Sequence, residues 1–233
     1  MQGLSRELRV GVILAVSSLS SVFLYLSGVV LYQDTWFWFL NWNLALAWLP
    51  LLFGWLLIRH VRQHSWLSWQ GVLYSLLWLG FLPNSFYIAS DFIHLRHATS
   101  ATALYYAVLI LSFCMSGFLL GYTSLYRIHR QLLKHLGTRQ AHAVIGLVLL
   151  LCSFAIYLGR YLRWNTWDVL VNPAGILFDV SDRLINPSAN GQLFRITMLF
   201  FVALGTMYYV LWMLLQTLQL PHPPASHKTD LLD

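Results

Sequence analysis

Six long apolar segments, separated by shorter polar connections, dominate the sequence. A helix needs about 20 apolar residues to cross a hydrocarbon layer about 30 Å thick, because each residue rises about 1.5 Å. We predict spanning helices at Leu8 to Tyr32, Leu40 to Ile58, Trp69 to Ala89, Leu104 to Tyr126, Ala141 to Leu158 and Ile196 to Leu218. The pattern therefore predicts an all-α membrane protein in which residues 1–220 form one polytopic helical domain. We expect residues 221–233 to be a disordered cytoplasmic tail, because this segment is polar and rich in proline.

The connection between the fifth and sixth spans holds a shorter amphipathic segment. Between Pro173 and Pro187, apolar residues alternate with Asp179, Asp182 and Arg183 over a helical period. This pattern predicts a further helix that lies on the outer membrane interface. Such a helix either roofs a site beneath it or is a passive surface element.

Composition limits the class of protein. Hydrophobic residues make up 58% of the chain and charged residues only 9%, against roughly 25% charged residues in a soluble domain. The net charge of +6 comes from 14 Lys and Arg that sit between the apolar segments, so it indicates membrane topology rather than a nucleic-acid partner. The two cysteines, Cys114 and Cys152, each lie deep in an apolar run, where a disulfide framework has no role. The lipid bilayer is the partner that these features predict.

The positions of Lys and Arg also predict the orientation. Placing both termini in the cytoplasm puts more of these residues inside than outside, as the positive-inside rule requires. The inner set is then mainly Arg59, Arg62, Arg127, Arg130, Lys134 and Arg139. We interpret this set as a topology signal in contact with lipid phosphates, without a dedicated inner site.

Small residues recur four positions apart in two of the predicted spans. The two segments are SSLSS at Ser17 to Ser21 and SGFLLG at Ser116 to Gly121. Small side chains let the backbones of neighbouring membrane helices approach closely. We therefore expect these segments to be helix-packing surfaces.

Polar side chains gather at the outer end of the third span, in the stretch FLPNSFYIASDFIHL. Pro83 lacks an N–H, so we expect the helix to kink or break there and Asn84 to help satisfy the freed carbonyls. From Asn84, the residues Tyr87, Asp91 and His94 follow at offsets that place them on one helical stripe. Taken one at a time, Tyr87 fits the role of an anchor at the membrane interface, and Asp91 fits the role of a solvated helix cap. Their alignment favours a shared site.

A second polar group follows the fifth span, whose outer end reads GRYLRWNTWD. It contains Arg160, Arg163, Trp164, Asn165, Trp167 and Asp168. Snorkelling of arginine and anchoring by tryptophan account for one or two of these, but not for all six. Because the third and fifth spans both emerge outside, we expect Asp91 to pair with Arg160 or Arg163. Asn41 and Asn43, at the outer end of the second span, are a further contribution.

A metal site is a weaker hypothesis for the same residues. Asp91 and His94 at i and i+3 can bind one metal, with Asp168 completing the set. The sequence has no HExxH, paired CxxC, phosphate-binding glycine loop or GxSxG motif, so the cofactor, if any, is unknown from the sequence. We favour an Asp–Arg network that is structural or orients a substrate.

Two motifs resemble a known family. LPNSFYIASDFIHL resembles the signature LPNAPYxxxDxxHL of a family of bacterial predicted membrane proteins that carries a domain-of-unknown-function label, and GRYLRWNTWD resembles its second signature, GRxLRxNxWD. The resemblance points to Pro83, Asn84, Tyr87, Asp91, His94, Arg160, Arg163, Asn165 and Asp168. Ser85 and Phe86 stand in place of the Ala–Pro pair, so a second proline-induced break is absent. The family implies the bacterial plasma membrane and brings no established activity.

Three functions fit these observations. The first is binding or transport of a polar solute or lipid headgroup, with Arg160 and Arg163 clamping a phosphate or carboxylate. The second is an outer-facing enzyme acting on a lipid-linked phosphorylated substrate, with Asp91 or His94 as general base. The third is an assembly or scaffold protein whose polar cluster locks the helices. We rank binding first, because no complete catalytic set is visible.

Overall fold

The computed structural model describes residues 5–164, 168–186 and 190–219, and this part of the chain is helical without any strand. The long helices are α1 (Arg6–Tyr32), α2 (Phe39–Val61), α3 (Trp69–Tyr87), α4 (Ala103–Leu132), α5 (Thr138–Tyr161) and α8 (Gly191–Gln219). The shorter elements are the 3₁₀ helices η1 (Trp36–Trp38) and η2 (Ile88–His97) and the helices α6 (Asp168–Val171) and α7 (Pro173–Ile185). The tail predicted at 221–233 lies outside the described residues.

In the part of the chain that the structure describes, six helical segments are long and apolar enough to cross a membrane, as the hydrophobic pattern predicted. The third runs from Trp69 to His97 because η2 continues directly from α3, so it is longer than predicted. The chain is a multi-pass membrane protein. The predicted amphipathic helix is α7, which begins at Pro173 and ends at Ile185.

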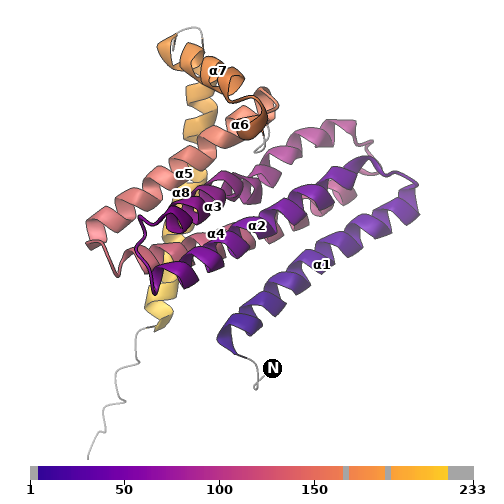
Figure 1. The fold of residues 1–233 in the computed structure, drawn as a ribbon. Coiled ribbons are helices and arrows are strands. Elements are labelled where there is room, and N and C mark those ends of the chain that lie inside the picture. Colours follow the sequence, from indigo (N-terminus) through magenta and orange to yellow (C-terminus); the bar gives the residue numbers. More distant parts are fainter. Residues whose placement is uncertain (1–4, 165–167, 187–189, 220–233) are drawn as a thin grey trace, which may run out of the picture.

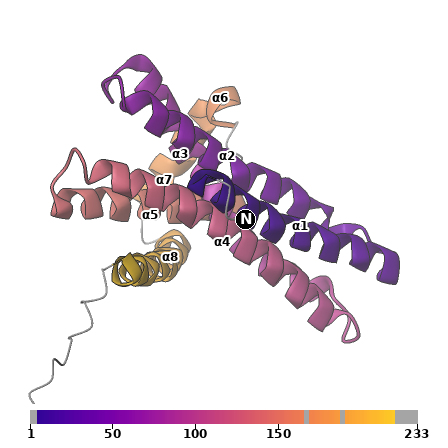
Figure 2. The same cartoon turned by 90° about the horizontal axis from the view of Figure 1, so that it is seen from below.

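The helices α1 to α5 lean in a common direction, and α8 is steeply inclined to them (Figures 1 and 2). Helix α2 packs against both α3 and α4, α1 packs on α4, and α8 packs mainly on α5. We name the two ends of the bundle as follows. Helix α1 begins at the termini end, where α2, α4 and α8 finish, and the opposite end is the Asp91 end.

Small residues bring α4 close to two neighbours, as their spacing predicted. The Ser116 hydroxyl of α4 lies 2.7 Å from that of Ser17 and 3.0 Å from that of Ser21, both on α1. On another face of α4, a Cβ added to Gly117 would lie 2.5 Å from the backbone oxygen of Ser85 on α3. A larger residue at this position would push α3 and α4 apart.

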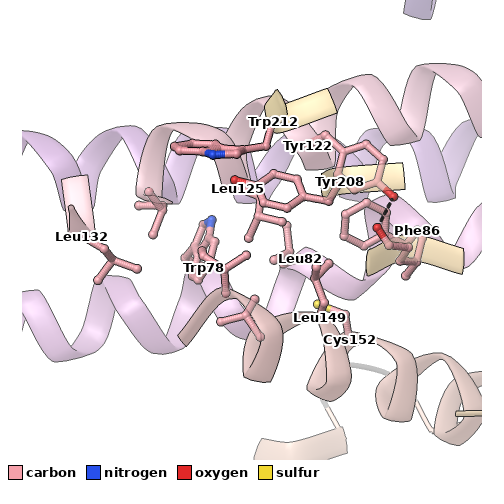
Figure 3. Packing of buried hydrophobic residues seen from close by; sticks show 14 of the residues in the cluster. Trp78, Leu82, Phe86, Tyr122, Leu125, Leu132, Leu149, Cys152, Tyr208 and Trp212 are labelled. Carbon is pink, nitrogen blue, oxygen red and sulfur yellow. Dashed lines mark hydrogen bonds between the residues drawn. The ribbon is translucent and has the colours of Figure 1, made fainter. Parts of the chain in front are cut away.

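Among the described residues, the largest group of buried side chains joins α2, α3, α4, α5 and α8 (Figure 3). It includes Trp78, Leu82, Phe86, Tyr122, Leu125, Leu149, Cys152, Tyr208 and Trp212. Several polar atoms in this group bond across helices: the Tyr122 hydroxyl donates to the Leu204 carbonyl at 3.0 Å, and Trp78 Nε1 donates to Ser124 Oγ at 2.9 Å. These bonds tie α3 to α4 and α4 to α8, which fixes the frame that carries the Asp91 end.

The third span changes its winding near the Asp91 end. The sequence predicted a kink or break at Pro83, but α3 continues as an α-helix through Pro83 to Tyr87. The winding tightens to a 3₁₀ helix only at Ile88 and stays so for 10 residues, whereas 3₁₀ runs usually last about 3–4 residues. The prediction of a break at Pro83 was therefore wrong.

Candidate functional site

A buried ion pair joins the third and fifth spans. Arg160, in the last turn of α5, donates a short charge-assisted hydrogen bond from Nη2 to Oδ1 of Asp91 on η2. The Asp91 side chain is 1% exposed and that of Arg160 is 13% exposed. The sequence left Arg160 and Arg163 as alternative partners for Asp91, and the structure selects Arg160.

The second oxygen of Asp91 is held from a third helix. Asn43, near the start of α2, donates from Nδ2 to Asp91 Oδ2 at 3.1 Å. Each carboxylate oxygen of Asp91 thus has a donor from a different helix. A buried carboxylate needs a hydrogen-bond donor for each oxygen, because removing the charged group from water is costly.

Arg160 is anchored by three further residues. Its Nε and Nη2 donate to Ser90 Oγ at 2.9 and 2.6 Å, and its Nη1 lies 3.1 Å from His94 Nε2. Its guanidinium also lies over the Tyr87 ring, 4.6 Å from the centroid, where a cation–π attraction adds to the hydrogen bonds. The guanidinium is therefore fixed in one orientation.

The contact with Arg160 also defines the state of His94. Arginine is always a donor, so Nε2 of His94 accepts, and the ring is neutral with its proton on Nδ1. Nδ1 is buried and has no hydrogen-bond partner among the described residues. His94 therefore presents a donor that still requires an acceptor.

The 3₁₀ winding of η2 explains how these side chains meet. At 3.0 residues per turn, positions three apart eclipse one another, so Asp91, His94 and His97 lie in a row. The rings of His94 and His97 are accordingly stacked, with centroids 6.2 Å apart. In an α-helix, Asp91 and His94 would still share a face, but each step of three residues would turn them about 60° apart, so the row would be less closely aligned than in η2.

These residues line a cavity of about 500 Å³ between α2, α3, α5 and the start of α7. The polar members are Asn43, Asn84, Tyr87, Asp91, His94 and Arg160. Its apolar wall includes Leu79, Pro83, Leu151, Ala155 and Leu158. A mostly apolar cavity of this size with a few convergent polar groups is typical of a small-molecule site. We call this cavity the chamber.

Helix α7 reaches the cavity through Ile176. It is attached to the end of α5 by a hydrogen bond of 2.9 Å from Trp164 Nε1, at the cavity edge, to Asp179 Oδ2. Arg183 secures the same carboxylate, with Nη1 3.4 Å from Asp179 Oδ1. Figure 1 shows α6 and α7 together beyond the end of α5, which is where a cover for the cavity would have to lie.

The other predicted site residues divide into separate groups. Asn84 lines the cavity and donates from Nδ2 to the Phe81 carbonyl at 3.1 Å, a bond that supports the helix next to Pro83. Arg163 is exposed, has a left-handed backbone (φ 60°) and is not a lining residue, so the structure does not bring it to the Asp91–Arg160 cluster. Asp168 begins α6 and does not line the cavity either. Asn165 lies outside the described residues.

The prediction from sequence missed Ser90 entirely. Ser90 accepts two hydrogen bonds from Arg160 and donates one, at 2.7 Å, to the Tyr87 carbonyl. A single serine at the end of an apolar helix carries no distinctive pattern, so only the position of Arg160 reveals its role.

The described part of the chain contains no group of three or more His, Cys, Asp and Glu side chains that could hold a metal ion. Asp91 and His94 are close, with Oδ1 and Nε2 3.9 Å apart, but Arg160 contacts both atoms. A cation at this position would have to displace the guanidinium. The geometry therefore fits recognition by hydrogen bonds better than metal coordination.

The fold and the cavity together define a six-span helical membrane protein. Its chamber lies at one end of the bundle and combines an apolar wall with a few polar groups. The chain belongs to the family described as protein of unknown function (DUF1361), whose model matches residues 42–211. That match contains the whole of the Asp91–Arg160 cluster. No curated protein and no solved structure matches the chain.

Proposed function

We propose that this protein binds the polar headgroup of a membrane lipid or lipid-linked molecule in the chamber at the Asp91 end. The single observation that carries the proposal is the Asp91–Arg160 ion pair built into the wall of an amphipathic cavity. A buried pair contributes little net stability compared with apolar packing, and charged groups within membrane spans usually mark functional sites.

The charge balance of the chamber indicates the kind of headgroup. Asp91 neutralises Arg160, and His94 is neutral, so the lining carries no net charge. This balance supports a neutral or zwitterionic head rather than the anion clamp that two arginines would have formed. The apolar wall of the cavity accommodates the hydrocarbon next to such a head.

The location that we propose is the bacterial inner membrane, with the Asp91 end facing outward and both termini in the cytoplasm. The support is the excess of Lys and Arg at the termini end. In this orientation α7, with Leu177, Phe178 and Ile185 exposed, lies at the outer interface where apolar side chains enter the lipid.

A cavity-filling substitution tests the proposal without altering any charge. Ala155→Phe places a ring against the chamber, whereas Ala143→Phe makes the same change on an exposed face of α5. Native mass spectrometry of detergent-purified protein, titrated with zwitterionic phosphatidylethanolamine, measures binding. We expect Ala155→Phe to weaken binding at least about tenfold, or about 1.4 kcal/mol, and Ala143→Phe to leave it unchanged. Equal affinities in the two variants would refute binding in the chamber.

The enzyme and the scaffold remain alternative hypotheses with distinct outcomes. An enzyme acting on a phosphorylated lipid would release product when purified protein is incubated with that lipid, and Asp91→Asn would abolish the release. A scaffold would tolerate Asp91→Asn with full function and bind no lipid in the chamber.

A further inference from the structure

A second and larger cavity lies at the termini end of the bundle. Its volume is about 960 Å³, and it is bounded by α1, α2, α4 and α8. Among the described helices, the two cavities share only α2. The chamber adjoins the start of α2, whereas the second cavity adjoins its end at Trp55 to Arg62. We call it the basic cavity because of the residues that follow.

The charges on this cavity are strongly one-sided. Five cationic residues line it, Arg59, Arg62, Arg127, Arg130 and Lys134, against the single carboxylate of Glu7. Within the described residues, Arg59, Arg62, Arg127 and Lys134 take part in no ion pair. The cavity therefore attracts an anion, in contrast to the neutral chamber.

Two of these cations are held in place by aromatic neighbours. Arg59 lies over the Trp55 ring, 5.5 Å from the centroid. Arg130 lies over the Tyr126 ring at 6.0 Å and donates from Nη1 to the Tyr126 hydroxyl at 3.5 Å. Arginine that stacks on an aromatic ring keeps edge N–H groups for a planar or tetrahedral oxyanion.

Topology alone does not explain this arrangement. Cations near the ends of α2 and α4 satisfy the positive-inside rule and the negative ends of the helix dipoles, which explains their side of the membrane. Neither effect requires them to surround one cavity with an apolar interior. Arg139, at the start of α5 and outside the cavity, satisfies the same rule.

The apolar walls extend from the cations toward the middle of the bundle. They comprise Met115, Phe118 and Leu119 on α4 and Met207, Leu211 and Leu215 on α8. From Arg130 to Met115, α4 rises about 22 Å, which exceeds half of a hydrocarbon layer about 30 Å thick. The cavity thus has the length to hold both the headgroup and the chains of a lipid from one leaflet.

We propose that the basic cavity binds an anionic phospholipid, with its phosphate among the arginines and its acyl chains between α4 and α8. Basic pockets between membrane helices on the cytoplasmic side are suited to such headgroups. This inference is independent of the proposed function, because the two cavities differ in charge and lie at opposite ends of α2. A bound lipid would fill the space between α4 and α8 and add to the contacts that already join α8 to the bundle.

The test compares two substitutions that remove the same charge. Arg127→Gln changes a half-buried lining residue, and Arg139→Gln changes an exposed residue outside the cavity. The probe is phosphatidylglycerol added to delipidated, detergent-purified protein, with binding read by native mass spectrometry. Each cation near a lipid phosphate contributes about a fivefold change in affinity. We therefore expect Arg127→Gln to weaken phosphatidylglycerol binding about fivefold and Arg139→Gln to leave it unchanged. The triple variant Arg59→Gln/Arg127→Gln/Lys134→Gln should weaken binding on the order of a hundredfold.

Four results would overturn the inference. Equal losses in Arg127→Gln and Arg139→Gln would show attraction to net charge alone. Equal binding of phosphatidylglycerol and phosphatidylethanolamine would show that the lipid's charge is not recognised. Displacement of phosphatidylglycerol by millimolar inorganic phosphate would make free phosphate the ligand. Leu119→Trp, which narrows the apolar track without altering charge, is expected to weaken phosphatidylglycerol binding, and unaltered binding would also contradict the proposal.

Discussion

Replacing Arg160 by methionine removes the cation beside Asp91 while keeping a long side chain. The Asp91 carboxylate is 1% exposed, so it cannot regain water, and only the 3.1 Å bond from Asn43 would remain. Loss of one partner from a buried pair costs about 3–5 kcal/mol. We expect the free energy of unfolding of Arg160→Met to fall by about that amount.

The same reasoning predicts that the second substitution restores stability. Asp91→Asn alone strands Arg160, which is 13% exposed and keeps Ser90 and His94 as partners, so it should cost less, about 1–3 kcal/mol. The double variant Asp91→Asn/Arg160→Met holds no uncompensated charge. It should therefore be more stable than Arg160→Met, with a coupling energy of about 2–3 kcal/mol.

Equilibrium unfolding in mixed micelles, followed by circular dichroism as dodecyl sulfate is added, measures these differences. Arg163→Met serves as the matched control, because Arg163 is exposed and outside the cluster, and we expect a change within about 0.5 kcal/mol. The test is whether the two single-variant losses of stability add up in the double variant. If their sum equals the loss in the double variant to within about 0.5 kcal/mol, direct coupling between Asp91 and Arg160 is refuted.

Three further predictions concern the frame and its orientation. Gly117→Ala should destabilise the protein by about 1–3 kcal/mol in the same unfolding assay, because its new methyl would meet the Ser85 backbone. The control Gly146→Ala has open space around it and should not destabilise the protein. Equal effects of the two substitutions would contradict the close packing of α3 on α4. Because Cys114 and Cys152 are buried, a membrane-impermeant maleimide should label Ser100→Cys but not Gln63→Cys in intact cells, and the reverse pattern would invert the proposed topology. Trp164→Phe removes the bond to Asp179, so amide hydrogen exchange should accelerate in α7 and not in α2; unchanged exchange would show that Trp164 does not secure α7.

Much of the fold follows from the sequence because lipid restricts the alternatives. A spanning segment must satisfy its own backbone hydrogen bonds, so apolar runs of sufficient length become helices. The prediction of α7 from its amphipathic pattern and of helix contacts from Ser17 to Ser21 and Ser116 to Gly121 rests on equally local rules. These features depend on neighbours along the chain and are therefore readable from it.

The site was predicted only in part, because it depends on the path of the backbone between helices. Asp91 was named for its alignment with Asn84 on one helical stripe, and Arg160 for the density of polar residues after the fifth span. One of the two proposed pairings was confirmed. Arg163 is three residues further along the chain, beyond the end of α5, where it is exposed, has a left-handed backbone and does not line the cavity. The switch to 3₁₀ winding at Ile88 also left no sequence signal, although it places Asp91, His94 and His97 in one row.

The most direct test of the central claim uses the double variant Asp91→Asn/Arg160→Met, which should remain folded while losing the recognition groups of the chamber. Wild type and variant are extracted from native membranes without added lipid, and mass spectrometry identifies what each retains. The account predicts a neutral or zwitterionic amphiphile at near-stoichiometric amounts in the wild type and its loss from the folded variant. Retention of the same molecules at equal amounts by both proteins would contradict headgroup binding at the Asp91–Arg160 site.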